Sequence, residues 1–61
     1  SNEKKVLQFL REHLMITRKE TQTLLEVSQS TAGRILKAMV DSGQIKQIGG
    51  SRTTRYELRK E

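Results

Sequence analysis

The feature that most constrains this chain is a stripe of apolar residues at helical spacing near its middle. The stripe occupies positions i, i+3, i+4, i+7 and i+8, and its members are Ala32, Ile35, Leu36, Met39 and Val40. Such a stripe is typical of an amphipathic helix that buries one face in a core. We therefore predict a helix from about Gln29 to Ser42. Ser28 can cap its start, and Gly43 stands where a helix needs a left-handed residue to end.

A second helix is predicted before it, from Glu3 to Leu14. Its apolar residues also fall on one stripe, and they are Val6, Leu7, Leu10 and Leu14. Met15 and Ile16 interrupt that pattern. A short extended segment at this point would place both of their side chains near the core.

A capping box marks the start of a third, shorter helix. Thr17 is followed three residues later by Glu20, a spacing at which each side chain can satisfy a backbone N–H of the first turn. This helix is expected to run to about Leu25, with Thr21, Leu24 and Leu25 on its inward face. Val27 then lies in a tight turn before Ser28.

Two short strands are predicted at the C-terminal end, over residues 45–48 and 55–58, joined by a long basic loop over residues 49–54. Tyr56 and Leu58 would share one face of the second strand, and Arg55 and Glu57 the other, so the strand would be half-buried. The predicted fold class is α+β: a three-helix bundle followed by a two-stranded antiparallel hairpin.

Size and composition favour one domain over residues 1–61, since the chain is too short for a second core. Ser1 and Asn2 resemble a remnant of tag cleavage, and we expect the natural protein to be longer. The chain has no cysteine, which suits a cytoplasmic location, and no apolar run near the ~20 residues that cross a membrane. We therefore expect a soluble protein that does not use a membrane.

The charge of the chain is compatible with nucleic-acid binding and with a domain that is basic only for solubility. The chain carries 12 Lys and Arg against 7 Asp and Glu, a net of +5. Residues 43–61 hold five basic and two acidic side chains, a net of +3, so the C-terminal third contributes most of the excess. A basic balance of this size favours nucleic-acid binding, although many small domains are mildly basic for solubility.

Two helices joined by a short turn, the second with a polar and basic exposed face, make a helix-turn-helix, and the hairpin after them makes a wing. The order and spacing of these parts resemble the bacterial winged-helix superfamily over residues 24–37, 43–45 and 49–58. The Gly-rich loop that ends in Arg55-Tyr56-Glu57-Leu58 is similar to the C-terminal winged-helix modules of RecG-like helicase-related regulators and Fic-domain proteins.

The chain departs from the superfamily pattern in two places. Glu26 stands where the family usually has a glycine in the turn, and Thr21 and Gln22 replace more usual apolar and alanine residues. The resemblance implies binding of double-stranded DNA, although a minority of the superfamily uses the same fold to bind proteins.

The candidate DNA-binding residues lie on the second helix of the motif and on the wing. They are Gln29, Ser30, Thr31, Arg34, Lys37, Lys46, Arg52 and Arg55. Arg34 could donate two bonds to a guanine and Gln29 could pair with an adenine, while the wing could follow the phosphates or enter the minor groove. A solvated helix face and a hairpin kept soluble by charge are the alternatives.

Gly33 is unexpected inside a helix, where it costs about 1 kcal/mol relative to alanine. It could allow close approach of phosphates or close packing against the preceding helix. His13 has no cysteine or second histidine to share a metal, and we expect no metal, no cofactor and no enzymatic site. With Phe9 and Tyr56 as its two aromatics, the chain lacks a stacking platform for single strands.

The leading hypothesis is a transcriptional regulator or the DNA-binding module of a larger regulatory protein. The alternative is a winged-helix module that binds another protein and no DNA. The sequence leaves open whether the domain forms a homodimer and which domain is fused to it.

Overall fold

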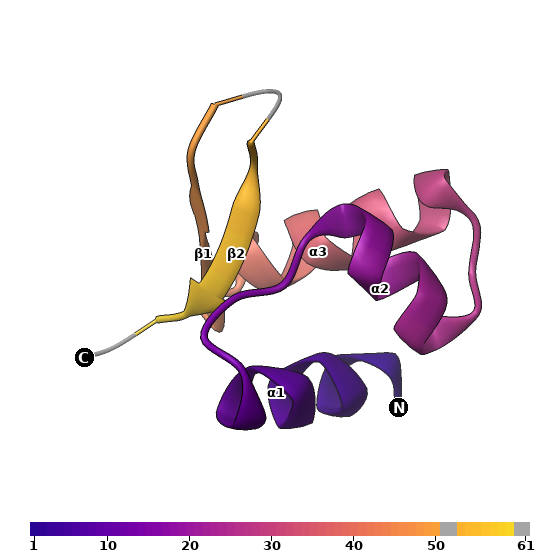
Figure 1. The fold of residues 1–61 in the computed structure, drawn as a ribbon, viewed down its shortest axis with the longest axis horizontal. Coiled ribbons are helices and arrows are strands. Elements are labelled where there is room, and N and C mark those ends of the chain that lie inside the picture. The colour runs from indigo at the N-terminus through magenta and orange to yellow at the C-terminus, as the bar shows by residue number, and fades with distance from the viewer. Residues whose placement is uncertain (51–52, 60–61) are drawn as a thin grey trace.

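The computed structural model describes residues 1–50 and 53–59. Its elements follow the chain in the order α1 (Asn2–Glu12), α2 (Arg18–Leu25), α3 (Gln29–Asp41), β1 (Ile45–Ile48) and β2 (Arg55–Leu58). The two strands are antiparallel, and Figure 1 shows the hairpin standing beside the three helices. The predicted α+β winged-helix fold is confirmed.

Helix α1 is shorter at its C-terminal end than its apolar pattern suggested. It ends at Glu12, and His13 is already extended, with its ring stacked on that of Phe9 at a centroid distance of 4.1 Å. Helical spacing no longer determines where the next side chain points, so Leu14 is 86% exposed. The prediction that Leu14 lies on the buried stripe of the helix was therefore wrong. At the other end, the Ser1 hydroxyl caps the helix by accepting a bond from the Lys4 N–H.

The segment between α1 and α2 is extended and pairs with the sheet. The Ile16 N–H donates to the Tyr56 carbonyl at 2.9 Å, and the Tyr56 N–H donates to the Ile16 carbonyl at 2.8 Å. Successive side chains of an extended segment point in opposite directions. Ile16 is therefore fully buried while Met15 is 41% exposed, and the expectation that both lie near the core fails for Met15.

The helix-turn-helix has the predicted boundaries. The Thr17 hydroxyl accepts a bond from the Glu20 N–H at 3.1 Å, and the Glu20 carboxylate accepts one from the Thr17 N–H at 2.9 Å, which confirms the capping box. Glu26 ends α2 in the left-handed conformation, with φ 58° and ψ 48°. The turn therefore forms with a glutamate where the family usually has glycine, and Ser28 then caps α3.

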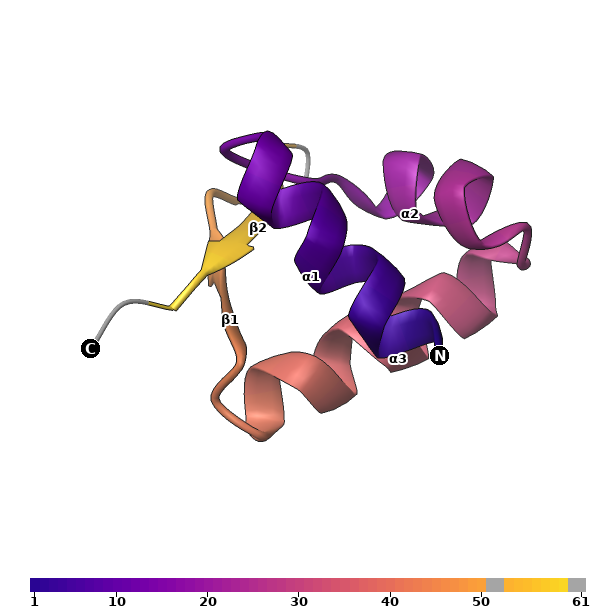
Figure 2. The ribbon, with the colours of Figure 1, turned by 90° about the horizontal axis from the view of Figure 1, so that it is seen from below.

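Every element contributes to one core. Its buried members are Val6, Leu10, Ile16, Leu25, Ala32, Leu36, Met39, Ile45 and Tyr56. Figure 2 shows α1 lying beside α2 and crossing α3, and its buried side chains contact both helices from below. The buried Thr21 is tolerated because its hydroxyl donates to the Thr17 carbonyl at 2.9 Å. On the α3 stripe, Ile35 and Val40 are only partly buried.

Helix α3 ends as the sequence predicts. Gly43 has φ +83°, and the N–H groups of Gly43 and Gln44 donate to the carbonyls of Val40 and Met39. These two bonds form a Schellman motif, which directs the chain into β1. Over the described residues, no helix is long and apolar enough to cross a membrane.

Candidate nucleic-acid interface

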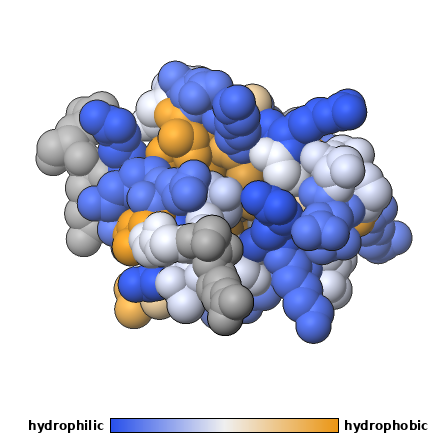
Figure 3. All heavy atoms as spheres, turned by 90° about the horizontal axis from the view of Figure 1, so that it is seen from above, coloured by the Kyte–Doolittle hydropathy of each residue, from blue (hydrophilic) through white to orange (hydrophobic). Residues whose placement is uncertain are grey.

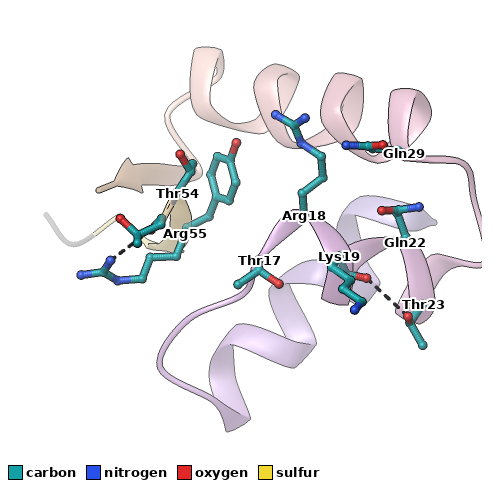
Figure 4. Close-up of a pocket in the computed structure, with 10 residues that line it drawn as sticks. Thr17, Arg18, Lys19, Gln22, Thr23, Gln29, Thr54 and Arg55 are labelled. Atoms are coloured by element: carbon teal, nitrogen blue, oxygen red, sulfur yellow. Dashed lines mark hydrogen bonds between the residues drawn. The ribbon is translucent and has the colours of Figure 1, made fainter. Parts of the chain in front are cut away.

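Two open hollows lie next to each other where the N-terminal parts of α2 and α3 face the hairpin. We call them the hairpin hollow, between α2 and the hairpin, and the α3 hollow, along the exposed side of α3. They share Arg18, Gln29 and Tyr56, so they form one continuous surface. Figure 4 shows the hairpin hollow, with Arg18 extending from α2 toward α3 and Arg55 at its edge on the hairpin side, its guanidinium turned away from Arg18.

The charge of this surface is almost entirely positive. Arg18, Lys19 and Arg55 line the hairpin hollow without an acidic residue, and Arg34, Lys37 and the single carboxylate Asp41 are added along the α3 hollow. None of these five cations forms an ion pair within the part of the chain that the structure describes. Cations without nearby carboxylates concentrate positive potential in a concave surface, which favours a polyanionic ligand.

The predicted residues of α3 fall into two groups. Gln29, Ser30, Arg34 and Lys37 are exposed and line the α3 hollow together. Thr31 is half-buried and lines neither hollow; its N–H donates to the Ser28 hydroxyl oxygen at 3.2 Å, and its own hydroxyl accepts from the Ser28 hydroxyl at 3.0 Å. Thr31 thus belongs to the N-terminal cap of α3.

The predicted residues of the wing are also divided. Arg55 lines the hairpin hollow, and its guanidinium Nη1 donates to the Thr53 carbonyl at 3.2 Å. Lys46 is paired across the strands with Glu57, its Nζ 3.3 Å from a carboxylate oxygen, and lines neither hollow. Because side chains alternate along a strand, Lys46 and Gln47 point to opposite faces, and Gln47 is the one in the α3 hollow.

The remaining predicted residue of the wing, Arg52, lies outside the residues that the structure describes.

Sequence reasoning missed the contribution of α2. Arg18 and Lys19 directly follow the capping residue Thr17, so they lie on the first turn of the helix that crosses the DNA backbone in helix-turn-helix proteins. Two adjacent basic residues directly after a helix cap could have indicated from the sequence that α2 contributes to the basic surface. The sequence did not indicate that Gln47 and Tyr56 line the α3 hollow, because their positions there depend on how the hairpin packs against α3.

Arg18 lies against α3 at Gly33. A Cβ atom built on Gly33 would be 3.6 Å from Nε and 3.8 Å from Cζ of Arg18, which is ordinary van der Waals contact. Figure 4 shows the Arg18 side chain extending from α2 toward α3. The neighbour of Gly33 is therefore the end of a flexible side chain, so close packing of the two helix backbones does not explain the glycine.

The surface around the hollows is rich in polar side chains. Figure 3 views the molecule from above, on the side of the hairpin and the start of α2, and shows hydrophilic residues over most of this face. Hydrophobic patches are visible between them. A mainly polar surface is typical of interfaces with nucleic acid.

The comparisons with known proteins bear on the whole chain. The family model that describes the C-terminal domain of DIP2311-like transcriptional regulators matches residues 3–59. No curated protein and no solved structure matches the chain. Because the family match spans nearly all of the sequence and the fold agrees with it, the chain belongs to the family of C-terminal domains of DIP2311-like transcriptional regulators.

Proposed function

We propose that this domain binds double-stranded DNA, with α3 in the major groove and the hairpin against the backbone or in the minor groove. The observation that carries the proposal is the continuous surface of the two hollows, lined by five cations and one carboxylate on a helix-turn-helix. An exposed helix of this kind has the diameter of the major groove. Membership of a transcriptional regulator family supports the same function.

Base reading is assigned to the exposed side chains of α3. Arg34 can donate two parallel bonds to the O6 and N7 atoms of guanine, and Gln29 can pair with adenine. Ser30 lies on the same exposed side and can bond to either a base or a phosphate. Thr31 supports this turn through its contact with Ser28.

Phosphate contacts are assigned to Lys37, Lys46, Arg52 and Arg55. Lys37 and Arg55 line the hollows directly, and Arg52 extends the series as a proposal from the sequence. Lys46 lies on the face of β1 opposite the hollows. Its side chain is 51% exposed, so its pair with Glu57 is weak and can exchange for a phosphate where the hairpin follows the DNA backbone. Such contacts hold the protein in register without reading sequence.

The test is to select a preferred duplex from a random pool and to measure binding by fluorescence anisotropy. Arg34→Ala should cost about 1–3 kcal/mol on that duplex and relax the preference at one position, while binding to random duplex falls less. Arg11→Ala is the matched control, because Arg11 is an exposed arginine on α1 outside both hollows. Equal losses for the two variants would contradict the assignment.

A protein partner in place of DNA is the alternative, and Asp41 in the α3 hollow is the observation that favours it. A carboxylate there repels phosphate and suits a partner with basic groups. Binding to duplex distinguishes the two: a DNA-binding domain binds duplex with an affinity that falls steeply with salt through counterion release, whereas a domain that binds only a protein leaves the duplex free.

The family description also bears on the setting of the domain. Since the matching model describes a C-terminal domain, we propose that this chain serves as the DNA-binding module of a larger regulatory protein. The narrower resemblance to modules of RecG-like helicase-related regulators and Fic-domain proteins stays a prediction from the loop sequence.

A further inference from the structure

The fold gives no reason for a glycine at position 33. Gly33 lies within α3, and the glycines with positive φ are Gly43 and Gly49 among the described residues. A Cβ at Gly33 would meet ordinary contacts with the Arg18 guanidinium and nothing else within 4 Å apart from the backbone of its own helix and its chain neighbours. Alanine would therefore fit, and it would make the helix more stable. The glycine therefore lowers the stability of the domain, and no packing contact at position 33 compensates for this loss.

The missing side chain leaves a shallow notch in the proposed DNA-facing surface. Gly33 lines the α3 hollow, and Ser30 and Lys37 stand one turn away on either side of it. The Arg18 side chain enters this notch from α2, and it is exposed and in no hydrogen bond or ion pair within residues 1–50 and 53–59. The Arg18 guanidinium, whose N–H groups have no hydrogen-bond acceptor among the described residues, thus lies beside the backbone of α3 at Gly33.

We propose that Gly33 and Arg18 form a single contact point for the DNA backbone. The absence of a Cβ leaves the Arg18 guanidinium as the group that covers α3 at the notch, so a sugar-phosphate segment bound to it can approach the helix closely. The guanidinium of Arg18, lying across the notch, donates to the phosphate oxygens of that segment, a geometry in which arginine can form two parallel bonds. This inference rests on the proposed function and adds two binding residues to it, one on each helix of the motif.

The test of Gly33 is whether stability and affinity change in opposite directions. Gly33→Ala should raise the melting temperature by roughly 4–8 °C and weaken binding to the selected duplex by about tenfold. Ala38→Gly is the matched control, because Ala38 is exposed on the same helix and lines neither hollow. It should lower the melting temperature and leave the affinity unchanged.

The test of Arg18 uses the salt dependence of binding. Arg18→Gln should flatten the slope of log affinity against log salt by about 0.9, and Arg11→Gln, which removes the same charge from α1, should leave the slope nearly unchanged. The variant with both Gly33→Ala and Arg18→Gln should lose less affinity than the two single losses multiplied, since both changes remove one contact.

The outcomes separate this inference from the proposed function. Three outcomes would refute the single contact point while DNA binding by the parent domain stands. Gly33→Ala could bind the duplex as well as the parent, or Arg18→Gln could have the same salt slope as Arg11→Gln. The affinity losses of the two single variants could also multiply in the double variant. If the parent domain itself binds no duplex, the proposed function fails.

Discussion

The left-handed residue in the turn of the helix-turn-helix allows a sharp test of the structure. Glu26 ends α2 with φ 58° and ψ 48°. In this region the Cβ of an L-residue crowds the following carbonyl oxygen, at a cost of roughly 1–2 kcal/mol. Glu26 is exposed, and its side chain makes no hydrogen bond or ion pair within the described residues. Replacement by glycine should therefore remove strain without removing a contact.

The charge of Glu26 must be separated from its Cβ. The Glu26 carboxylate lies at the C-terminus of α2, whose dipole disfavours it, and just before α3, whose dipole favours it. Each interaction is about 0.3–1 kcal/mol, and Glu26→Gly loses both. Glu26→Gln loses the same charge and keeps the Cβ. The difference in unfolding free energy between the two variants should be about 1 kcal/mol in favour of Glu26→Gly, after the larger unfolded-state entropy of glycine is subtracted.

The assay is thermal unfolding of the two variants followed by circular dichroism, in which the charge–dipole interaction cancels because both are neutral at position 26. For a domain of 61 residues, a difference of about 1 kcal/mol corresponds to a melting temperature about 4–8 °C higher for Glu26→Gly than for Glu26→Gln. If Glu26→Gly melts at or below Glu26→Gln, position 26 is not left-handed and the account of the turn is wrong.

Three further predictions concern the core, the cap and the hairpin. Leu36→Ala should cost roughly 2–5 kcal/mol because Leu36 is fully buried; denaturant unfolding would show this, and a parent-like midpoint would contradict the core assignment. Thr17→Ala should cost about 0.5–2 kcal/mol in the same measurement, since it removes the capping box of α2, and an unchanged midpoint would mean that the cap is not formed. Lys46→Ala should change stability by less than about 1 kcal/mol yet flatten the salt slope of DNA binding by about 0.9, and an unchanged slope would remove Lys46 from the phosphate contacts.

Local signals made most of the fold predictable. The capping box at Thr17, the apolar stripe from Ala32 to Val40 and the glycine at position 43 each act within one or two turns of chain, and the structure has all three. Leu14 was placed wrongly because the local pattern did not show where the helix ends. The stripe is informative only while the helix continues, and the helix ends at Glu12, with His13 already extended.

The candidate site was less predictable, because it depends on which elements face each other. Gln29, Arg34 and Lys37 could be found from the helical spacing of one segment. Arg18 could not be placed against Gly33 without knowing how α2 crosses α3. The pairing of Lys46 with Glu57 likewise depends on the register of the hairpin, which the two strand patterns did not specify.

DNA binding is tested most directly by measuring the affinity of the domain for its selected duplex at several salt concentrations. Four phosphate contacts, from Lys37, Lys46, Arg52 and Arg55, predict a slope of about −3.6 for log affinity against log salt, and Arg18 brings it to about −4.5. A slope near zero, together with a selection that returns no preferred duplex, would contradict DNA binding and favour a protein partner.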